Sequence, residues 1–327
     1  MRAAFIEELG APDVIRYGEI AAPRPGPTDV LVDVEATTVN PVDTFVRSGA
    51  FRTHVYFPFV IGRDLVGTVA AAGPGATGFR AGERVWCNSL GHEGRQGAAA
   101  QQAVVAADRL YPLPGGVDPC EAVAVLHPAA TAYLALFTHG HLRVGETVLV
   151  AGAAGHVGSA LVTLAARAGA RVLATAAAAD ARYCADLGVD QVLDYRDPDL
   201  VRKLRQAAPL GVDLYLDAAG VNDLDTTVGL LARRGRVVLL AGAGTRPVLP
   251  AGALYMNDRS VIGFVISHAT SGELAEAAAC LVDLLGRRAL RPRRTEVRPL
   301  SAAREVHARM EKGELRGVRA VLRTDLG

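Results

Sequence analysis

The chain has 327 residues, enough for about two domains, and half of them are hydrophobic, which is typical of a globular protein with a sizeable core. Its formal net charge is +1, so no strong field recruits nucleic acid or an anionic membrane. The four cysteines are far apart and form no CxxC pair, which argues against a disulfide framework or a structural zinc cluster.

The N-terminal segment is polar within its first ten residues and lacks the apolar centre of a signal peptide. No apolar run is expected to last the ~20 residues that a membrane span requires. We therefore expect a cytoplasmic protein that acts on a small molecule.

Short apolar runs in the first third are separated by turn formers such as PRPGP and GPGATG, a pattern that favours a small β-barrel. From about residue 118 to 140 the sequence is typical of a helix. The predicted strands of this part include DVLVDVEATTVN (29–40), VGTVAAAG (66–73) and ERVWCN (83–88).

From Thr147 onward, apolar strands alternate with amphipathic helices at the spacing of βαβ units. This alternation predicts a doubly wound parallel sheet covered on both faces. The predicted strands contain the runs ETVLVA, RVLATA, QVLDY, VDLYLD, RVVLLAG and SVIGFVI.

After residue 266 we expect a helix over 271–287, an extended basic stretch over 291–300, a helix over 301–312 and a final strand, VRAVLR. This tail is expected to leave the parallel sheet and to complete the N-terminal domain. The fold class is thus α/β, with a catalytic domain of residues 1–122 and 268–327 and a Rossmann domain of residues 123–267.

The strongest motif is the stretch Gly152, Ala153, Ala154, Gly155, His156, Val157 and Gly158, between a predicted strand and a predicted helix. Glycines let the backbone turn and approach a pyrophosphate, while the helix N-terminus supplies amide donors. The spacing alone is weak evidence, but the strand–turn–helix context required of a dinucleotide site is present. His156 is unusual there, and it is either a pyrophosphate contact or a solvent-facing side chain.

The end of the second predicted strand distinguishes NADPH from NADH. An acid there holds the ribose hydroxyls of NAD, but this strand ends around Thr175 with no acid before Asp180. Its absence favours NADPH, because a carboxylate would repel a 2′-phosphate. Arg182 and Tyr195 are candidate phosphate partners, joined by Arg316 from the tail; each is equally well explained as a surface residue.

Several stretches resemble the zinc-independent quinone oxidoreductase branch of the medium-chain dehydrogenase/reductase superfamily, the zeta-crystallin group. The resemblance covers essentially the whole chain in order. It is carried by NPVDTFVRSG (40–49), PFVIGRDLVG (58–67), AGERV (81–85), PAATAY (128–133) and the glycine loop.

The resemblance implies a GroES-like barrel formed by both chain ends, with the cofactor in the cleft between the domains. Zinc-dependent relatives carry a cysteine at the position of Asn40 and Gly-His-Glu at the positions of Gly62, Arg63 and Asp64. A catalytic zinc needs about three protein ligands, so we expect no metal. The tripeptide at Gly91–Glu93 (GHE) lies in a predicted loop, without partners.

Carried over by position, Asn40 faces the nicotinamide ribose, Phe51 lies against the nicotinamide ring, and Thr131 lies near the reactive end of the cofactor. For these residues ordinary core packing is the competing explanation. The further expected cofactor contacts are Ala219, Gly242, Gly244, Phe264, Val265 and Ile266.

Hydride transfer leaves negative charge on the acceptor oxygen, and a donor already in place helps most. Arg63 or Asn40 is expected to stabilise that charge or to hold an acidic substrate group; alternatively, Arg63 pairs with Asp64 or Asp43. An aromatic group of Phe45, Phe51, Tyr56, Phe57 and Trp86 indicates an apolar cleft for flat acceptors.

Three functions stay open: an NADPH:quinone reductase, an enone or enoyl reductase of a biosynthetic pathway, and a non-catalytic NADPH-binding protein. The segment 97–101 (GAAAQ) lacks the aromatic residue that the family commonly has there, which weakens the quinone assignment. The apolar strand at 260–266 predicts a homodimer joined edge to edge.

Overall fold

The computed structural model describes residues 1–326, which form two compact units. The barrel unit comprises Met1–His127 and the chain from Thr270 onward, and the Rossmann unit comprises Pro128–Ala269. These boundaries lie beyond the predicted ones at 122/123 and 267/268. The helix α2 (Pro119–Tyr133) runs without a break through the first boundary, so no loop in the sequence marks it.

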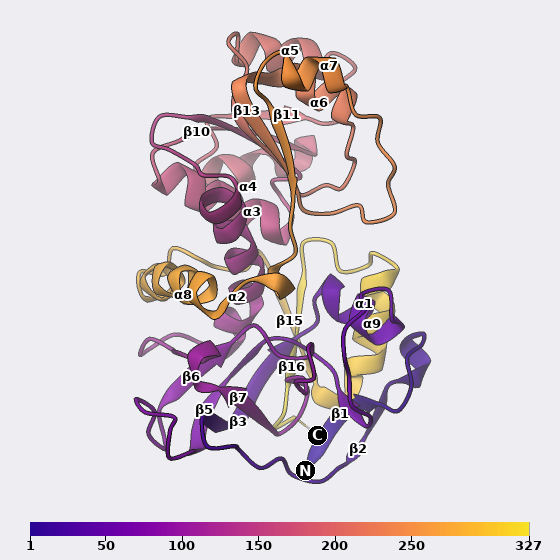
Figure 1. Cartoon of the computed structure of the whole chain (residues 1–327), viewed down its shortest axis with the longest axis vertical. Helices are drawn as coiled ribbons and strands as arrows, with labels where there is room; N and C mark the ends of the chain where they lie inside the picture. The colour runs from indigo at the N-terminus through magenta and orange to yellow at the C-terminus, as the bar shows by residue number, and fades with distance from the viewer. Residues whose placement is uncertain (327) are drawn as a thin grey trace. The chain divides into compact units, whose positions relative to one another are not determined.

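The Rossmann unit contains a six-stranded parallel sheet in the order β11-β10-β9-β12-β13-β14. Figure 1 labels three of these strands, β10, β11 and β13. This order reverses direction between β9 and β12, which is the point where doubly wound folds bind ligands. The strands are β9 (Thr147–Ala151), β10 (Arg171–Ala176), β11 (Gln191–Asp194), β12 (Val212–Asp217), β13 (Leu231–Leu239) and β14 (Ser260–Gly263).

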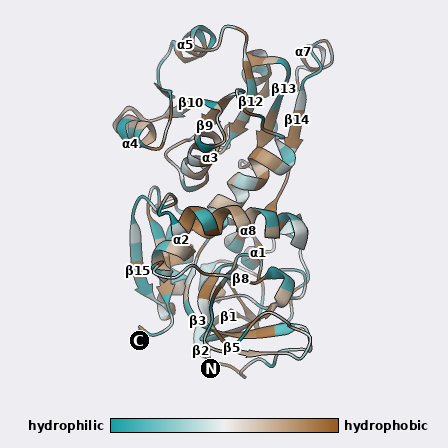
Figure 2. Ribbon diagram, turned by 90° about the vertical axis from the view of Figure 1, so that its left-hand side faces the viewer, coloured by the Kyte–Doolittle hydropathy of each residue, from teal (hydrophilic) through white to brown (hydrophobic). Residues whose placement is uncertain are grey.

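Helices on both faces explain why these strands are apolar runs rather than alternating ones. Most residues of β9, β10 and β12 are buried, and the brown colour of several strands in Figure 2 marks this hydrophobicity. The predicted α/β class and parallel sheet are confirmed. The helices are α3 (His156–Arg167), α4 (Ala181–Asp186), α5 (Leu200–Ala207), α6 (Leu224–Leu230) and α7 (Ala251–Tyr255).

The barrel unit is built from a three-stranded sheet, β2-β1-β4, and a seven-stranded sheet, β15-β16-β3-β5-β6-β8, in which β7 also pairs with β3. The chain's last strand pairs with β3, so the C-terminal tail does complete the N-terminal domain. The strands are β1 (Arg2–Ile6), β2 (Arg16–Glu19), β3 (Asp29–Thr38), β4 (Phe59–Val60), β5 (Leu65–Ala72), β6 (Arg84–Cys87), β7 (Gln102–Ala106), β8 (Tyr111–Pro112), β15 (Thr295–Pro299) and β16 (Arg319–Arg323).

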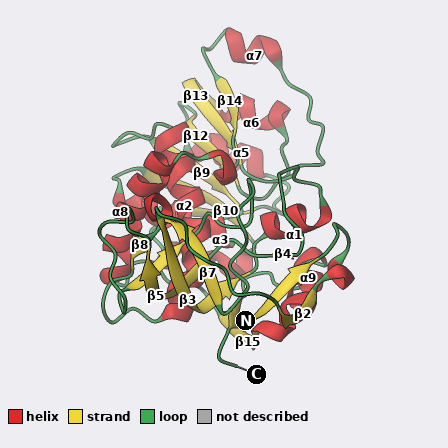
Figure 3. Cartoon of the chain, turned by 60° about the horizontal axis from the view of Figure 1, so that its bottom comes forward, coloured by secondary structure: helices red, strands yellow, loops and turns green. Residues whose placement is uncertain are grey.

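Three further helices belong to the barrel unit: α1 (Pro41–Ser48), α8 (Ser271–Gly286) and α9 (Ala303–Glu311). The helix α1 packs against α9, and both lie beside the three-stranded sheet (Figure 3). No helix was predicted for α1. Pro41 at its first position and Gly49, with φ of 80° after its end, are nevertheless typical helix start and stop signals.

Two predictions need correction. The strand expected at 260–266 ends at Gly263, because a 3-10 turn at Ile266–His268 follows. The helical segment Pro119–His139 is long and apolar enough to cross a membrane by length and composition, although no such run was expected. Its apolar window is 72% buried inside the protein, as in the core helix of a folded domain.

Candidate functional site

The glycine loop lies at the switch point of the Rossmann sheet. It leaves β9, turns at Gly152, with φ of 78°, and enters α3 at His156. A Cβ added to Gly158 would lie 2.1 Å from the carbonyl oxygen of Gly152, so only glycine fits there. No acidic residue occupies the first turn of α3, which leaves the positive end of the helix dipole for an anion.

The loop is held against the neighbouring strand ends by backbone hydrogen bonds. The N–H groups of Gly152 and Ala153 donate to the carbonyl of Thr175 at 3.2 and 3.1 Å. Ala219, which follows β12, lies so close that a Cβ on Gly152 would be 3.2 Å from its nitrogen. The structure therefore brings together the glycine loop, Thr175 and Ala219, which the sequence analysis selected separately.

A cationic group lies beyond the end of β10, where NAD-binding chains carry an acid. The N–H of Tyr195 donates to the carbonyl of Ala176 at 3.2 Å, which places this tyrosine beside the strand end. Arg196 donates to the Tyr195 hydroxyl at 2.9 Å, and its guanidinium carbon lies 5.0 Å from the ring centroid. The sequence analysis selected Tyr195 and Arg182, which is exposed, but missed Arg196.

Two residues that sequence reasoning missed shape the loops after β12 and β13. Asp217 accepts hydrogen bonds from the N–H groups of Ala219 (3.0 Å), Gly220 (2.7 Å) and Asn222 (2.8 Å). Asn222 in turn donates to the carbonyl of Ala241 at 3.0 Å. The sequence signal that could have identified Asp217 is an acidic residue at the end of an apolar strand, shortly before a glycine.

The remaining predicted contacts of the Rossmann unit lie on separate segments. Gly242 has φ of 79° and packs against Gly220, whereas Gly244 has open space around it. Thr131 lies on α2. Phe264 stacks on His139 with ring centroids 4.3 Å apart, and it is followed by half-buried Val265 and buried Ile266.

The barrel unit contains a buried polar cluster around Asn40, the residue before α1. The Asn40 side-chain nitrogen lies 2.8 Å from Oδ2 of Asp64 and 3.3 Å from Oδ2 of Asp43. Asp43 also accepts from the Asn40 backbone N–H at 2.7 Å. Burial, followed by the neighbouring Asp64, raises the pKa of Asp43 to about 6.

Arg319, distant in sequence, and the nearby Thr38 complete this cluster. Arg319 donates to Oδ1 of Asn40 at 2.9 Å and to the Thr38 hydroxyl at 3.0 Å. The Thr38 hydroxyl then donates to Oδ2 of Asp64 at 3.0 Å. Burial lowers the pKa of Arg319 from its ordinary value. Asn40 is thus surrounded by partners that fix both atoms of its amide.

Arg63 is almost completely buried, with 1% of its side chain exposed. Its Nε lies 3.9 Å from Oδ1 of Asp43, and its Nη1 lies 3.2 Å from Nδ1 of His92. His92 also lies 2.9 Å from Arg95, so the histidine of the tripeptide at 91–93 lies between two guanidinium groups. Burial, followed by the charge of Arg63, lowers the pKa of His92 to about 4.

The predicted aromatic cluster is divided by the structure. Trp86 is fully buried and lies 4.7 Å from Tyr111 between ring centroids, away from the exposed Tyr56 and Phe57. Phe51 is half-buried and packs against the core around β1 and α9. Its strand neighbours Val85 and Cys87 belong to a core cluster of the barrel unit, so the alternation of faces along β6 places Trp86 on the opposite face, against Tyr111.

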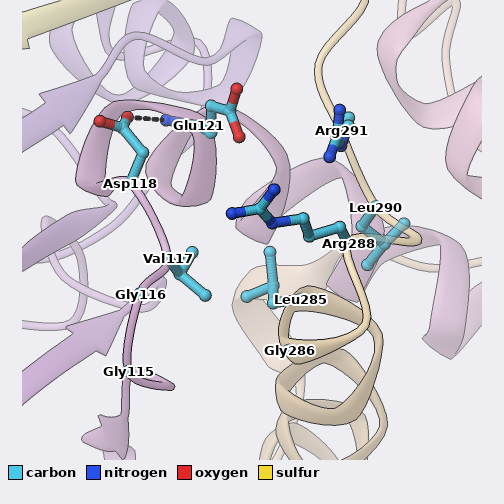
Figure 4. Close-up of a pocket in the computed structure, with 10 residues that line it drawn as sticks. All are labelled: Gly115, Gly116, Val117, Asp118, Glu121, Leu285, Gly286, Arg288, Leu290 and Arg291. Carbon is cyan, nitrogen blue, oxygen red and sulfur yellow. Dashed lines mark hydrogen bonds between the residues drawn. The ribbon is translucent and has the colours of Figure 1, made fainter.

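Asn40, Phe51 and Arg63 lie in the barrel unit together with the exposed Arg316, while the other predicted site residues lie in the Rossmann unit. Two surface cavities of the barrel unit, of about 530 and 490 Å³, are lined by none of them. The first lies between Gly115–Glu121 and Leu285–Arg291 (Figure 4). Among residues 1–326, no group of three or more His, Cys, Asp or Glu side chains is arranged to hold a metal.

Comparisons with known proteins agree with this architecture. The family described as "Alcohol dehydrogenase GroES-like domain" matches residues 26–115, and the family described as "Zinc-binding dehydrogenase" matches residues 157–283. The human quinone oxidoreductase is 30% identical over 316 residues, which cover 96% of this chain and 94% of the human protein. The chain belongs to the quinone oxidoreductase branch of the medium-chain dehydrogenase/reductase superfamily.

Solved structures of the superfamily support the same assignment. A mycobacterial quinone oxidoreductase superposes with a TM-score of 0.85 at 31% identity and covers 99% of both chains. A mycobacterial structure in complex with NADPH gives 0.84 at 31% identity, also over 99% of both chains. An NAD-dependent alcohol dehydrogenase gives 0.88 at 29% identity over the full length of both. The quinone oxidoreductase resemblance is confirmed, and the chain is an oxidoreductase.

Proposed function

We propose that this oxidoreductase uses NADPH, without zinc, to reduce a quinone by hydride transfer. The observation that carries the proposal is that two features lie together at the C-terminal ends of the parallel strands of the Rossmann sheet. One is the glycine loop that enters α3; the other is the Tyr195–Arg196 pair beside the acid-free end of β10. The mycobacterial relative bound to NADPH supports the same choice of cofactor.

The residues of the glycine loop fit a dinucleotide. Because Gly158 has no Cβ, the backbone of the loop can turn tightly there. The first turn of α3 contains no acidic side chain that would repel a phosphate. Backbone amides from Gly155 to Gly158 would hold the pyrophosphate. Arg196, oriented by Tyr195, would bind the 2′-phosphate as a charged donor.

The residues at the expected zinc positions do not fit a catalytic zinc. Zinc takes thiolate, imidazole or carboxylate ligands, but two of these positions carry the amide of Asn40 and the guanidinium of Arg63. The third, Asp64, already accepts hydrogen bonds from Thr38, Asn40 and His127. Although one family match is described as a zinc-binding dehydrogenase, we therefore propose chemistry without a metal.

When bound, the reduced nicotinamide supplies the hydride, and the protein supplies orientation and a dry pocket. Asn40 is the residue of the barrel unit that we assign to the nicotinamide ribose, because Asp64 and Arg319 hold its amide rigidly. Arg63 is buried against Asp43 and His92, so we assign it the role of holding this cluster rather than of touching the acceptor.

The test is the oxidation of NADPH, followed at 340 nm, with ortho-quinones, para-quinones and α,β-unsaturated ketones, after treatment with a chelator. NADH is measured alongside. The proposal predicts rapid NADPH loss with quinones that the chelator does not change. Faster NADPH oxidation with enones than with quinones would mean that the acceptor is an enone. NADPH binding without turnover of any acceptor would favour a non-catalytic role.

We also propose a homodimer formed through β14. This strand lies at the edge of the Rossmann sheet, where its free side presents backbone donors and acceptors. A parallel sheet with an unpaired apolar edge is stabilised by pairing with a second copy. Light scattering at micromolar concentration should give the mass of two chains, and the mass of one chain would contradict the proposal.

A further inference from the structure

The cavity of about 530 Å³ in the barrel unit lies between two walls (Figure 4). One wall is the segment Gly115–Glu121, which follows β8 and enters α2, and the other is Leu285–Arg291, which ends α8 and continues as a loop. Both walls belong to the same compact unit, and the cavity shares no residue with the proposed cofactor site. Its volume is in the range usual for sites that hold small molecules.

Both walls are anchored to the rest of the barrel unit. The Arg84 guanidinium donates to the carbonyl of Val117 at 3.0 Å, and α8 packs against β8. The Asp118 carboxylate accepts from the backbone N–H of Glu121 at 2.9 Å, which caps the start of α2. The cavity is therefore formed by segments that are already in place before a ligand binds.

The charged side chains that line the cavity are balanced in sign. The arginine pair, Arg288 and Arg291, lies on one wall, and the acidic pair, Asp118 and Glu121, lies on the other. All four side chains are exposed, and among the residues that the structure describes none of them forms an ion pair. Two guanidinium groups and two carboxylates thus face one cavity without neutralising each other directly.

Arg288 occupies a backbone position that usually carries glycine. Its N–H donates to the carbonyl of Leu285 at 2.9 Å, and the N–H of Ala289 donates to the carbonyl of Leu284 at 2.8 Å. These two bonds form the Schellman ending of α8, in which the left-handed residue is most often glycine. Arg288 has φ of 54° there, a conformation that disfavours any residue with a Cβ. The left-handed turn directs its guanidinium toward the opposite wall of the cavity (Figure 4).

We propose that this cavity binds a small zwitterion whose two charged groups are joined by an aliphatic chain. Its carboxylate binds the arginine pair, and its ammonium group binds the acidic pair through charge-assisted hydrogen bonds. Val117, Leu285 and Leu290 line the same cavity and supply apolar surface for the chain between the two groups. A simple anion or a simple cation is attracted by one pair and repelled by the other, so the balanced lining favours a ligand that carries both charges.

The test uses the full chain and a series of linear ω-amino acids from 3-aminopropanoate to 8-aminooctanoate, with affinities measured by saturation-transfer NMR. Because the walls are fixed, one chain length should bind most tightly. The alkanoate and the alkylamine of that length each lack one charged group and should bind about tenfold more weakly. Equal affinity of either one, or no saturable binding in the whole series, would overturn the proposal.

Arg288→Gly separates backbone strain from binding, because glycine suits the left-handed position but carries no charge. Its Tm should rise by about 2 °C, while its affinity for the best ω-amino acid should fall about tenfold. The matched control is Arg287→Gln, because the neighbouring Arg287 pairs with Asp283 and does not line the cavity. This control should bind normally, and equal losses of affinity in the two variants would overturn the proposal.

Glu121→Gln tests the opposite wall. It keeps the backbone N–H that Asp118 accepts and removes only the negative charge. The best ω-amino acid should bind about tenfold more weakly, and the alkanoate of the same length should not be weakened. Unchanged affinity for the ω-amino acid would overturn the proposal. None of these measurements involves NADPH or an acceptor, so their outcome is independent of the proposed function.

Discussion

The two units build their polar sites in opposite ways. In the Rossmann unit the site is made of backbone: Gly152 turns, Gly158 leaves room for a carbonyl, and α3 supplies amides. In the barrel unit it is made of side chains, and Asp64 alone receives hydrogen bonds from three of them. A backbone site depends on the absence of side chains, whereas a side-chain cluster depends on each partner and its charge.

This difference predicts opposite sensitivities to substitution. Adding one methyl group should damage the glycine loop, although it changes no charge. Removing one charge should damage the polar cluster, although it adds no volume. The following four predictions test this contrast, from the largest expected effect to the smallest.

Asp64→Ala should reduce the free energy of unfolding by about 3–5 kcal/mol, because it removes the buried carboxylate that accepts from Thr38 and Asn40 and offsets the charge of the buried Arg319. Urea unfolding followed by circular dichroism measures the change. The control is Asp33→Ala on the exposed face of β3, which should stay within about 0.5 kcal/mol. Equal losses in the two variants would show that the cluster contributes no special stability.

Gly158→Ala should destabilise the chain by about 1–3 kcal/mol, since its Cβ would lie 2.1 Å from the Gly152 carbonyl. It should also weaken NADPH binding by displacing the loop. Gly229→Ala in α6 is the matched control, because nothing lies within 4 Å of its Cβ, and it should stabilise the helix by about 0.5–1 kcal/mol. Both are measured by thermal melting and fluorescence titration, and normal NADPH binding by Gly158→Ala would contradict the backbone account.

The third prediction concerns the pH dependence of stability that comes from His307, a buried histidine on α9 outside the polar cluster. Neither of its ring nitrogens has a hydrogen-bond partner, and burial, followed by the charge of Arg47, lowers its pKa to about 3. The unfolded chain binds a proton near pH 6.5 and the folded chain does not, so stability falls as the pH drops below 6.5. The loss between pH 7 and pH 5 is about 2 kcal/mol for this ring.

His307→Leu should remove that part of the acid sensitivity, measured as urea unfolding at the two pH values. Asp43 acts in the opposite direction, because its raised pKa reduces stability as the pH rises toward 6, but it is present in both proteins. The exposed His141→Asn should leave the pH dependence unchanged. An unaltered slope in His307→Leu would mean that His307 is protonated in the folded protein.

Arg196→Ala should weaken NADPH binding by about tenfold and leave NADH binding unchanged, because the side chain is assigned to the 2′-phosphate alone. Arg202→Ala, an exposed arginine on α5 that pairs with Asp199, serves as control. Calorimetric titration with both nucleotides separates the two effects. Equal weakening of NADPH and NADH binding would mean that Arg196 contacts a group common to the two nucleotides.

The same contrast explains what could be predicted from the sequence. The glycine loop, its strand and its helix are contiguous, so the motif and its context were visible together, and Thr175 and Ala219 follow from strand order. Arg196 was missed because its role depends on β11 lying beside β10, which places it next to an acid-free strand end.

The side-chain cluster was largely hidden. Asn40 and Arg63 were found through family resemblance, but Arg319 is 281 residues from Thr38 and His127 is 63 residues from Asp64. No local pattern marks such pairs. The partners of His92 were missed for the same reason, since a loop histidine has no periodicity that predicts burial beside Arg63 and Arg95.

The most direct test of the central claim is a calorimetric titration of the chelator-treated protein with NADPH and with NADH. The account predicts that NADPH binds at least tenfold more tightly, with one site per chain, and that added zinc changes neither affinity. Equal affinity, or tighter binding of NADH, would contradict the assignment of the Tyr195–Arg196 pair and with it the proposed use of NADPH.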